Sequence, residues 1–196
     1  MSPIQAMERS YGELRGRLRA GAFAPGARLE ASRLADELGV SATPIRDALH
    51  QLVGERLVEM SIGEGFRVPR LSEAELRDLY EWLSTILSMA VRTTPPAMLA
   101  AAIDGVAAQD VIADWTADLF ERVASVVPNG ELRTAILIAT DRIHPFRMIE
   151  GAVLGVNEAE LAELSRVDPA QSQVLKRYHL RRMRVAPELV RRRNGR

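Results

Sequence analysis

Apolar residues at helical spacing dominate the first 55 residues, and a short stretch of alternating apolar and polar residues follows. The helical spacing predicts three helices, at Ile4–Ala20, Ala31–Leu38 and Pro44–Glu55. A short strand is expected between the first two of these helices. After the third helix, alternation on both sides of two glycines predicts a two-stranded hairpin, with strands at Leu57–Met60 and Phe66–Pro69.

From Leu71 onward the strand signals vanish and helical spacing continues almost to the end of the chain. Ser72 followed by acidic residues is typical of a helix N-terminus, and apolar spacing extends that helix to about Val91. Five further helices are expected, at Ala97–Ala108, Val111–Val127, Glu131–Gly151, Glu158–Arg166 and Pro169–Arg184. The end, Arg191–Arg196, is expected to fray. The chain is therefore predicted to be mainly α, with one domain at 1–70 and an all-α bundle at 71–196.

Composition narrows the class of protein without identifying it. The 196 residues are 47% hydrophobic and 27% charged, which is ordinary for a globular protein. No run reaches the ~18 apolar residues of a membrane span, and the first residues lack the basic-then-apolar order of a secretion signal. The chain has no cysteine, which excludes disulfides and thiolate metal sites. These features predict a cytoplasmic protein with no membrane partner.

Charge is segregated along the chain although the formal net charge is zero. Residues 1–70 carry 10 basic and 9 acidic side chains, residues 71–175 carry 7 and 16, and residues 176–196 carry 9 and 1. A neutral total therefore does not argue against a nucleic-acid partner. The Arg-rich end, Lys176–Arg196, is either a basic arm for the DNA backbone or a helix whose arginines pair with the acidic middle segment. The second alternative is favoured, because that acidic segment is a partner within the same domain or in a second subunit.

The segment Leu34–Val58 has the pattern of a helix-turn-helix motif. Two short amphipathic helices flank a Gly-Val-Ser turn, and in this motif the second helix enters the major groove of DNA. The start of that helix offers Ser41, Ala42, Thr43 and Arg46. Hydroxyl groups there can bond phosphates, and Arg46 can reach a guanine edge or a phosphate. The spacing alone also fits a plain helical hairpin, but the Gly-Xaa-Gly wing that follows favours a DNA-binding winged helix.

On these residues, Tyr11–Arg70 resembles the winged-helix domain of the GntR family of bacterial regulators. The matching landmarks are Ala24-Pro25-Gly26-Ala27-Arg28-Leu29, Leu34-Ala35, Leu38-Gly39-Val40-Ser41, Thr43-Pro44-Ile45-Arg46-Asp47-Ala48-Leu49, Leu57-Val58 and the two wing glycines. The resemblance implies that DNA is contacted by Ser32, Ser41, Ala42, Thr43, Arg46, Gly63 and Gly65, with Arg33 beside the first of them. Arginine is frequent in the family where Ser32 and Ala42 stand. We therefore expect fewer direct contacts to bases here, and a larger share of recognition through phosphate contacts and groove shape.

The second domain resembles the ligand-binding (FCD) domain of the FadR-like subfamily in its six-helix form. The resemblance rests on the segments 71–81 and 120–130, on Asp168 and on His179-Leu180. In that subfamily an Asp or Asn and three His hold a metal ion that helps bind a carboxylate effector. Here Ala117 and Glu121 occupy the first two of those positions, and Asn157 falls near the second histidine position. Only His179 matches directly, so we expect no bound cofactor; the alternative is a divalent metal held by Asp118, Glu121 and His179.

The first helix of the second domain also departs from the resemblance. Family members commonly place an Arg where Leu83 stands and a Glu where Leu87 stands, and both point toward the pocket. Replacing an anion-binding arginine by leucine removes a charge-assisted contact to a carboxylate. One hypothesis is therefore an apolar effector or a vestigial pocket; the alternative is that these leucines are core or dimer contacts. The candidate effector pocket consists of Leu83, Leu87, Glu121, Asn157 and His179.

Together these features predict a homodimeric, non-enzymatic repressor in the bacterial cytoplasm, associated with the nucleoid. It is expected to bind an inverted repeat in double-stranded DNA and to be released by a small molecule, because two-fold proteins read palindromes. An activator or a ligand-independent regulator is an alternative. An enzyme is disfavoured, because no nucleophile–base set or phosphate loop has supporting context. A third class is a protein-interaction adaptor that no longer uses its DNA-binding domain. An Arg46→Ala variant would separate it from the repressor, because unchanged DNA affinity would indicate that this domain does not read DNA as predicted.

Overall fold

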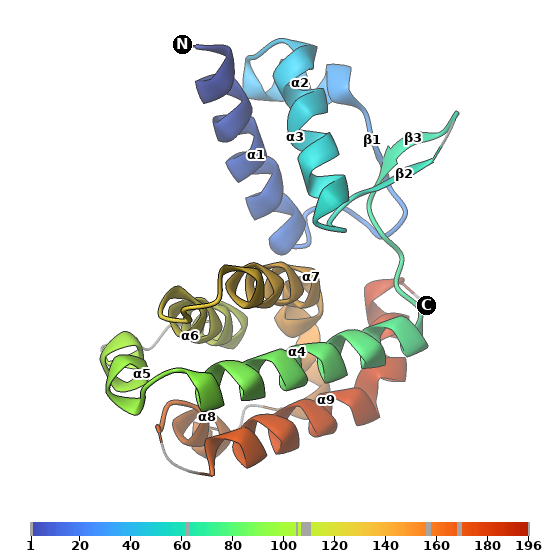
Figure 1. Cartoon of the computed structure of the whole chain (residues 1–196). Helices are drawn as coiled ribbons and strands as arrows, with labels where there is room; N and C mark the ends of the chain where they lie inside the picture. The colour runs from blue at the N-terminus through green and yellow to red at the C-terminus, as the bar shows by residue number, and fades with distance from the viewer. Residues whose placement is uncertain are drawn as a thin grey trace. The chain divides into compact units, whose positions relative to one another are not determined.

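The computed structural model describes residues 2–61, 63–104, 106, 111–155, 158–167 and 170–195. The chain divides into two compact units, Met1–Arg70 and Leu71–Arg196. We call them the N-terminal unit and the C-terminal unit, and each has its own hydrophobic core. Figure 1 labels the elements of both.

The N-terminal unit is a small helical domain with a three-stranded antiparallel sheet. Its elements are α1 (Pro3–Arg19), β1 (Arg28–Leu29), α2 (Ala31–Leu38), α3 (Ala42–Gly54), β2 (Glu59–Ser61) and β3 (Gly65–Arg67). The strand order is β1-β3-β2, and Phe66 lies opposite Leu29 on one side and Met60 on the other. Helices α1 and α2 both pack on α3, so one side of α3 lies in the core of this unit.

Local signals set the ends of these helices. At the start of α1, Ser2 and Gln5 form a capping box, in which each side chain accepts a hydrogen bond from the backbone of the other. At the end of α2, Gly39 adopts a left-handed conformation with a φ of 65°, which allows the chain to turn at once into α3.

The C-terminal unit consists of helices throughout its described residues. They are α4 (Glu73–Thr93), α5 (Pro96–Ile103), α6 (Ile112–Ser125), α7 (Gly130–Leu154), α8 (Glu158–Leu164) and α9 (Gln171–Arg193). Helices α4 and α9 lie side by side, and α7 packs against both of them and against α6 (Figure 1). Side chains from these four helices form most of the hydrophobic core.

The predicted fold class, a winged helix-turn-helix followed by an all-α domain, is confirmed. Several element boundaries differ from the predictions by a few residues, and two of the differences have a clear physical reason. The last helix, α9, was predicted to end at Arg184 but continues to Arg193, because Ala186, Leu189 and Val190 pack into the core. Arg191–Arg193 are therefore helical rather than frayed. The strand β2 begins at Glu59 rather than Leu57, because the backbone amides of Leu57 and Val58 donate to the Leu52 carbonyl at the end of α3.

None of the helices among the described residues is both long enough and apolar enough to cross a membrane alone. By length and composition, only α4 and α5 taken together would qualify, and they are bent by 118° at the break between them.

Candidate DNA-binding surface and ligand site

Helix α3 has one buried face and one exposed face. Ile45 and Leu49 are fully buried in the N-terminal core, whereas Ser41, Thr43 and Arg46 are exposed. Among the described residues, Arg46 makes no hydrogen bond or ion pair, so its guanidinium is available to a partner. Ser41 precedes the helix in an extended conformation, and its side chain makes no capping bond. A free guanidinium beside two hydroxyl groups at a helix start can bind phosphates and guanine edges.

The wing depends on two glycines in a conformation that other residues rarely adopt. Gly63 and Gly65 have φ values of 81° and 75°, so a side chain at either position would strain the turn between β2 and β3. Gly65 pairs with Ser61 across the hairpin. Gly63 is exposed and Gly65 is half-buried, as expected for the tip and the base of a wing.

The other predicted DNA contacts differ in how accessible they are. Ser32 and Arg33 are exposed on α2, and the Nε of Arg33 lies 3.5 Å from a carboxylate oxygen of Glu37. Ala42 is half-buried and packs against the N-terminal core, so it offers little surface. The structure thus brings Ser41, Thr43 and Arg46 together on one helix face. Contacts from α2 and the wing remain predictions.

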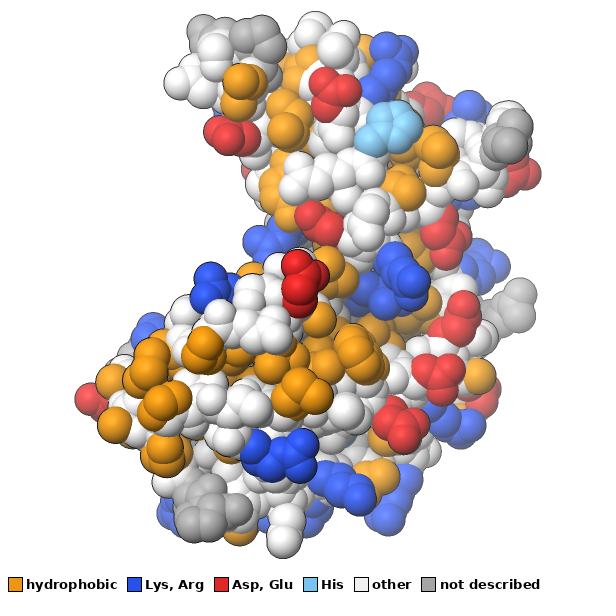
Figure 2. Space-filling view, in the orientation of Figure 1, with side chains coloured by type: hydrophobic (Ala, Val, Ile, Leu, Met, Phe, Trp, Pro, Cys, Tyr) orange, Lys and Arg blue, Asp and Glu red, His pale blue; other side chains and the backbone are white. Residues whose placement is uncertain are grey.

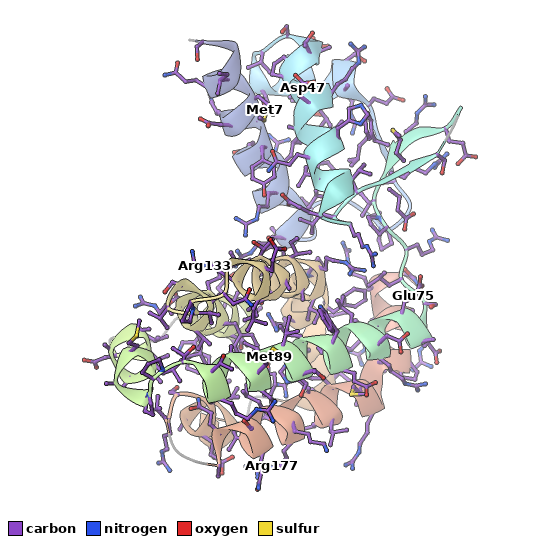
Figure 3. All side chains as sticks on the ribbon, in the orientation of Figure 1. Met7, Asp47, Glu75, Met89, Arg133 and Arg177 are labelled. Carbon is purple, nitrogen blue, oxygen red and sulfur yellow. The ribbon has the colours of Figure 1, made fainter. Side chains whose placement is uncertain are left out.

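The exposed face of α3 continues beyond the residues that the sequence singled out. Asp47, His50 and Gln51 are also exposed there, and Figure 3 labels Asp47 on this helix. The ring of His50 meets the ring of Phe66 edge-on, with centroids 5.0 Å apart, which ties α3 to strand β3. A histidine is visible at the surface of the N-terminal unit in Figure 2. His50 follows Arg46 by four residues, so helical spacing alone could have placed it on the same exposed face.

The predicted effector-pocket residues that the structure describes come from three helices, α4, α6 and α9, and their role as a pocket stays a prediction. Leu83 and Leu87 have exposed fractions of 0% and 1% and belong to the hydrophobic core, which agrees with the alternative that they are core contacts. Glu121 is half-buried on α6, and His179 is fully buried on α9. Asn157 lies outside the described residues, as does Asp168.

The metal site that the family resemblance implies does not fit these residues. Ala117 is buried and has no ligand atom, and Asp118 accepts a hydrogen bond of 3.0 Å from Arg122. In the described ranges, no three His, Asp or Glu side chains converge on a point where a cation could bind. His144, fully buried on α7, instead pairs through Nε2 with Asp114 at 2.9 Å.

The centre of the C-terminal unit instead holds a buried network of hydrogen bonds. The Glu150 carboxylate accepts a bond of 2.6 Å from the Tyr80 hydroxyl and one of 2.8 Å from Arg182 Nε. Arg182 also donates to Glu160 at 3.1 Å, and Arg181 donates to the same oxygen at 3.2 Å. Charged groups buried this deeply are tolerated only when they are paired in this way.

Aromatic side chains surround this network. The Arg182 guanidinium lies over the Tyr178 ring, 3.3 Å from its centroid, and Phe120 stacks on His179 with centroids 5.9 Å apart. Burial raises the pKa of Tyr178 and raises that of Tyr80 well above its usual value, so both hydroxyls stay protonated. We call the following eight residues the central polar cluster: Tyr80, Thr116, Phe120, Arg147, Glu150, Tyr178, His179 and Arg182.

His179 is neutral in this environment. Its Nδ1 lies 2.7 Å from the Leu175 carbonyl oxygen, which only accepts, so Nδ1 carries the hydrogen and Nε2 is an acceptor. Nε2 is buried without a partner. Burial lowers the pKa of His179 from 6.5 to about 3; the hydrogen bond to Leu175 opposes this shift, and the charges of Arg147 and Arg182 add to it.

Arg147 stands out within the cluster. Its side chain comes from α7 and is 4% exposed, and Nε and both Nη atoms lack a hydrogen-bond partner among the residues that the structure describes. The guanidinium carbon lies 5.0 Å from the centroid of the Phe120 ring. Arg147 also lines a cavity of about 30 Å³, together with Thr116, Glu150, Glu160, Arg182 and apolar residues of α6, α7 and α8.

The Arg-rich end of the chain pairs largely within its own unit. On α9, Arg177 contacts Glu163, while Arg181 and Arg182 contact Glu160. These contacts support the alternative in which the arginines meet the acidic middle of the chain.

The N-terminal unit thus has the arrangement of a winged helix-turn-helix DNA-binding domain, with α3 as its recognition helix. Residues 6–68 match the family model described as "Bacterial regulatory proteins, gntR family". The N-terminal unit is therefore a DNA-binding domain of the GntR family, as the sequence predicted.

Curated relatives match over less than half of this chain. The chain is 35% identical over 92 residues to the HTH-type transcriptional regulator McbR of Escherichia coli K12, a match covering 45% of this chain and 42% of McbR. It is 38% identical over 71 residues to the HTH-type transcriptional repressor GlaR of the same organism, covering 36% of this chain and 32% of GlaR. The matched region thus spans less than half the length of either relative.

Solved structures match over nearly the whole chain. The structure of E. coli McbR/YncC covers 96% of this chain and 98% of its own, with a TM-score of 0.69 and 20% identity. A GntR family member from Pseudomonas syringae pv. tomato covers 100% of this chain and 90% of its own, with a TM-score of 0.52 and 20% identity. At this identity the likeness establishes the fold of both units and nothing more specific.

Proposed function

We propose that the protein is a sequence-specific transcription regulator that acts from the bacterial cytoplasm on an inverted repeat in double-stranded DNA. The observation that carries this proposal is the exposed face of α3, where Arg46 has no partner and stands beside two hydroxyl groups. The GntR-family match of this unit supports it. The names of the relatives, which are transcriptional regulators and a repressor, favour regulation over catalysis.

The proposed active form is a homodimer. A single DNA-binding module buries roughly 600–1,000 Å² of protein surface on DNA, which is at the low end for specific binding. Two copies related by a two-fold axis would double that surface and select an inverted repeat. Dimerisation is accordingly part of the proposal, and sedimentation of the full chain with and without DNA measures it.

The C-terminal unit is proposed to respond to a small molecule and to hold no resident metal. The unpartnered Arg147 at its centre supports a ligand site there. This departs from the sequence-based hypothesis of an apolar effector, because the leucines behind that hypothesis lie in the core. A ligand-independent regulator or an activator is the alternative, and it predicts DNA binding that no small molecule changes.

The DNA-binding part is tested by selecting duplexes from a randomised library with the full chain and measuring affinity by fluorescence anisotropy. Arg46→Ala is expected to weaken binding by about 1–3 kcal/mol, because it removes a phosphate or guanine contact. Arg9→Ala is the matched control, because it removes the same charge from an exposed position on α1. Equal affinities for wild type and Arg46→Ala would show that α3 does not read DNA and would favour the adaptor alternative.

A further inference from the structure

We propose that two copies of this chain pair through the exposed face of α4, with the two α4 helices side by side and antiparallel. The inference rests on the homodimer proposed above and names the surface that forms it. Six exposed side chains make up this surface, which we call the α4 stripe: Asp78, Glu81, Trp82, Thr85, Met89 and Arg92.

The α4 stripe exposes two large apolar side chains. Trp82 is 51% exposed and Met89 is 43% exposed, although the opposite side of α4 lies in the hydrophobic core. Figure 2 shows hydrophobic side chains gathered over this face of the C-terminal unit, and Figure 3 labels Met89 on it. Exposed apolar patches rimmed by polar residues mark interaction sites, and tryptophan is enriched among the residues that dominate interface energies.

The stripe has the spacing of a helix-pairing seam. Steps of four, three, four and three residues, which keep side chains on one side of a helix, connect Asp78, Trp82, Thr85, Met89 and Arg92. The central hydroxyl, that of Thr85, donates to the Glu81 carbonyl at 2.9 Å. Its donor is satisfied within the helix, so burying it at a helix contact leaves no donor unpaired.

Charge sets the orientation of the second copy. Asp78 and Glu81 lie in the first half of α4, and Arg92 lies in its last turn. In the described part of the chain, these three side chains make no hydrogen bond or ion pair. A parallel second helix would bring like charges together. An antiparallel helix centred on Thr85 instead brings Arg92 beside the partner subunit's Asp78 and the partner subunit's Glu81, and the two-fold axis repeats this contact at the other end.

The same arrangement joins the apolar residues. Trp82 precedes Thr85 by three residues and Met89 follows it by four, so Trp82 lies beside the partner subunit's Met89. A two-fold interface must be complementary to itself, and the stripe meets this condition with apolar contacts inside and opposite charges outside. DNA is disfavoured as the partner of this surface, because Asp78 and Glu81 would repel phosphates.

The first experiment measures the dimer dissociation constant of the full chain by sedimentation equilibrium, without DNA. Met89→Glu is expected to raise this constant by at least about 30-fold, because it places a charge inside the interface twice. Met148→Glu is the matched control, since Met148 on α7 is also 43% exposed and lies outside the stripe. The control should change the constant by less than about 3-fold.

Charge reversal tests the pairing of the two ends. Arg92→Glu puts only acidic side chains at each end of the helix pair, and should weaken dimerisation by about 10-fold or more. The triple variant Asp78→Arg, Glu81→Arg, Arg92→Glu reverses every charge of the stripe and should restore the dimer. Misfolding cannot produce such a rescue.

A distance measurement tests the antiparallel orientation. The chain has no cysteine, so a nitroxide on Glu73→Cys labels one site per subunit. Glu73 lies 12 residues before Thr85, and an antiparallel pair therefore separates the two labelled positions by roughly 36 Å along the helix axis. Parallel helices would hold them roughly 10 Å apart. Pulsed electron paramagnetic resonance distinguishes the two distances.

The outcomes separate this inference from the proposed function. A dimer weakened by Met89→Glu and Arg92→Glu, restored by the triple variant and giving the long label distance, supports the inference. An equal loss with Met148→Glu, failure of the rescue or a short label distance would overturn it. A dimer that neither Met89→Glu nor Arg92→Glu weakens overturns this inference alone and leaves the homodimer and its Arg46-dependent DNA binding standing. A wild-type chain that sediments as a monomer with and without DNA contradicts the proposed homodimer itself.

Discussion

The N-terminal unit leaves Arg46 at its surface without a partner, whereas the C-terminal unit buries Arg147 and Arg182 at its centre. Arg46 projects from a single helix, and its guanidinium stays hydrated in the absence of DNA, so folding carries no desolvation penalty for it. The buried arginines depend on side chains from four helices for their environment. The contrast shows that substituting an exposed arginine should change the free energy of unfolding little, whereas substituting a buried one should change the stability of the C-terminal unit.

The largest effect is expected from breaking the buried network. Glu150→Leu leaves the Arg182 guanidinium and the Tyr80 hydroxyl without their shared acceptor. Removing one partner of a buried ion pair typically destabilises by about 3–5 kcal/mol, so the C-terminal unit should lose that much in urea-induced unfolding. Glu163→Leu, which breaks an exposed pair with Arg177, should cost less than about 1 kcal/mol. Similar losses for both variants would contradict the contrast between buried and exposed pairs.

The second effect tests whether Leu83 is a core residue or lines a pocket. Leu83→Ala removes most of a fully buried side chain and should destabilise by roughly 2–5 kcal/mol. The control is Glu81→Ala, an exposed position two residues earlier on α4, which should change stability by about 0.5 kcal/mol or less. If Leu83→Ala left unfolding unchanged but altered the response to a ligand, the pocket interpretation would be restored.

The third effect concerns pH. Because burial lowers the pKa of folded His179 from 6.5 to about 3, its contribution to stability is complete above pH 6.5. That contribution is lost as the pH falls from 6.5 toward 3, since the unfolded chain takes up the proton first. Wild type should lose about 2 kcal/mol more than His179→Asn between pH 6.5 and 5, when chemical unfolding is compared at each pH. Parallel pH profiles would show that His179 can be protonated in the folded protein.

The smallest effect separates two serines that both precede helices. Ser72 makes a capping box with Glu75, so Ser72→Ala should cost about 1 kcal/mol of stability. Ser41 makes no capping bond, so Ser41→Ala should leave stability nearly unchanged and weaken DNA binding instead. Thermal unfolding and fluorescence anisotropy on both variants provide the comparison. The reverse pattern would assign Ser41 to folding and remove it from the DNA-binding surface.

Sequence spacing was enough to predict the exposed face of α3, because the candidate DNA contacts there follow one another within one short segment. Helical spacing placed Ile45 and Leu49 inside and Arg46 outside, and Gly39 marked the turn before them. The family resemblance then implied a role for the same residues. No tertiary information was needed, because neighbours along the helix share the exposed face.

The central polar cluster was not predicted, because it forms where four helices meet. Arg182 lies in the Arg-rich end, which was expected to pair with the acidic middle segment. Tyr178, Arg182 and Ala186 repeat every four residues along the buried side of α9. Arg147 follows Ile143 in the same way on α7. Helical phase was therefore an available signal, but which residues meet across helices depends on packing that spacing does not specify.

The most direct test of the account is a hydroxyl-radical footprint of the full chain on a selected duplex. Wild type is predicted to protect two half-sites related by a two-fold axis, roughly 10 base pairs or a multiple of that apart. Arg46→Ala should lose both protections, and Arg9→Ala should keep them. Protection of a single half-site, or the same footprint with Arg46→Ala, would contradict a dimer that reads DNA through α3.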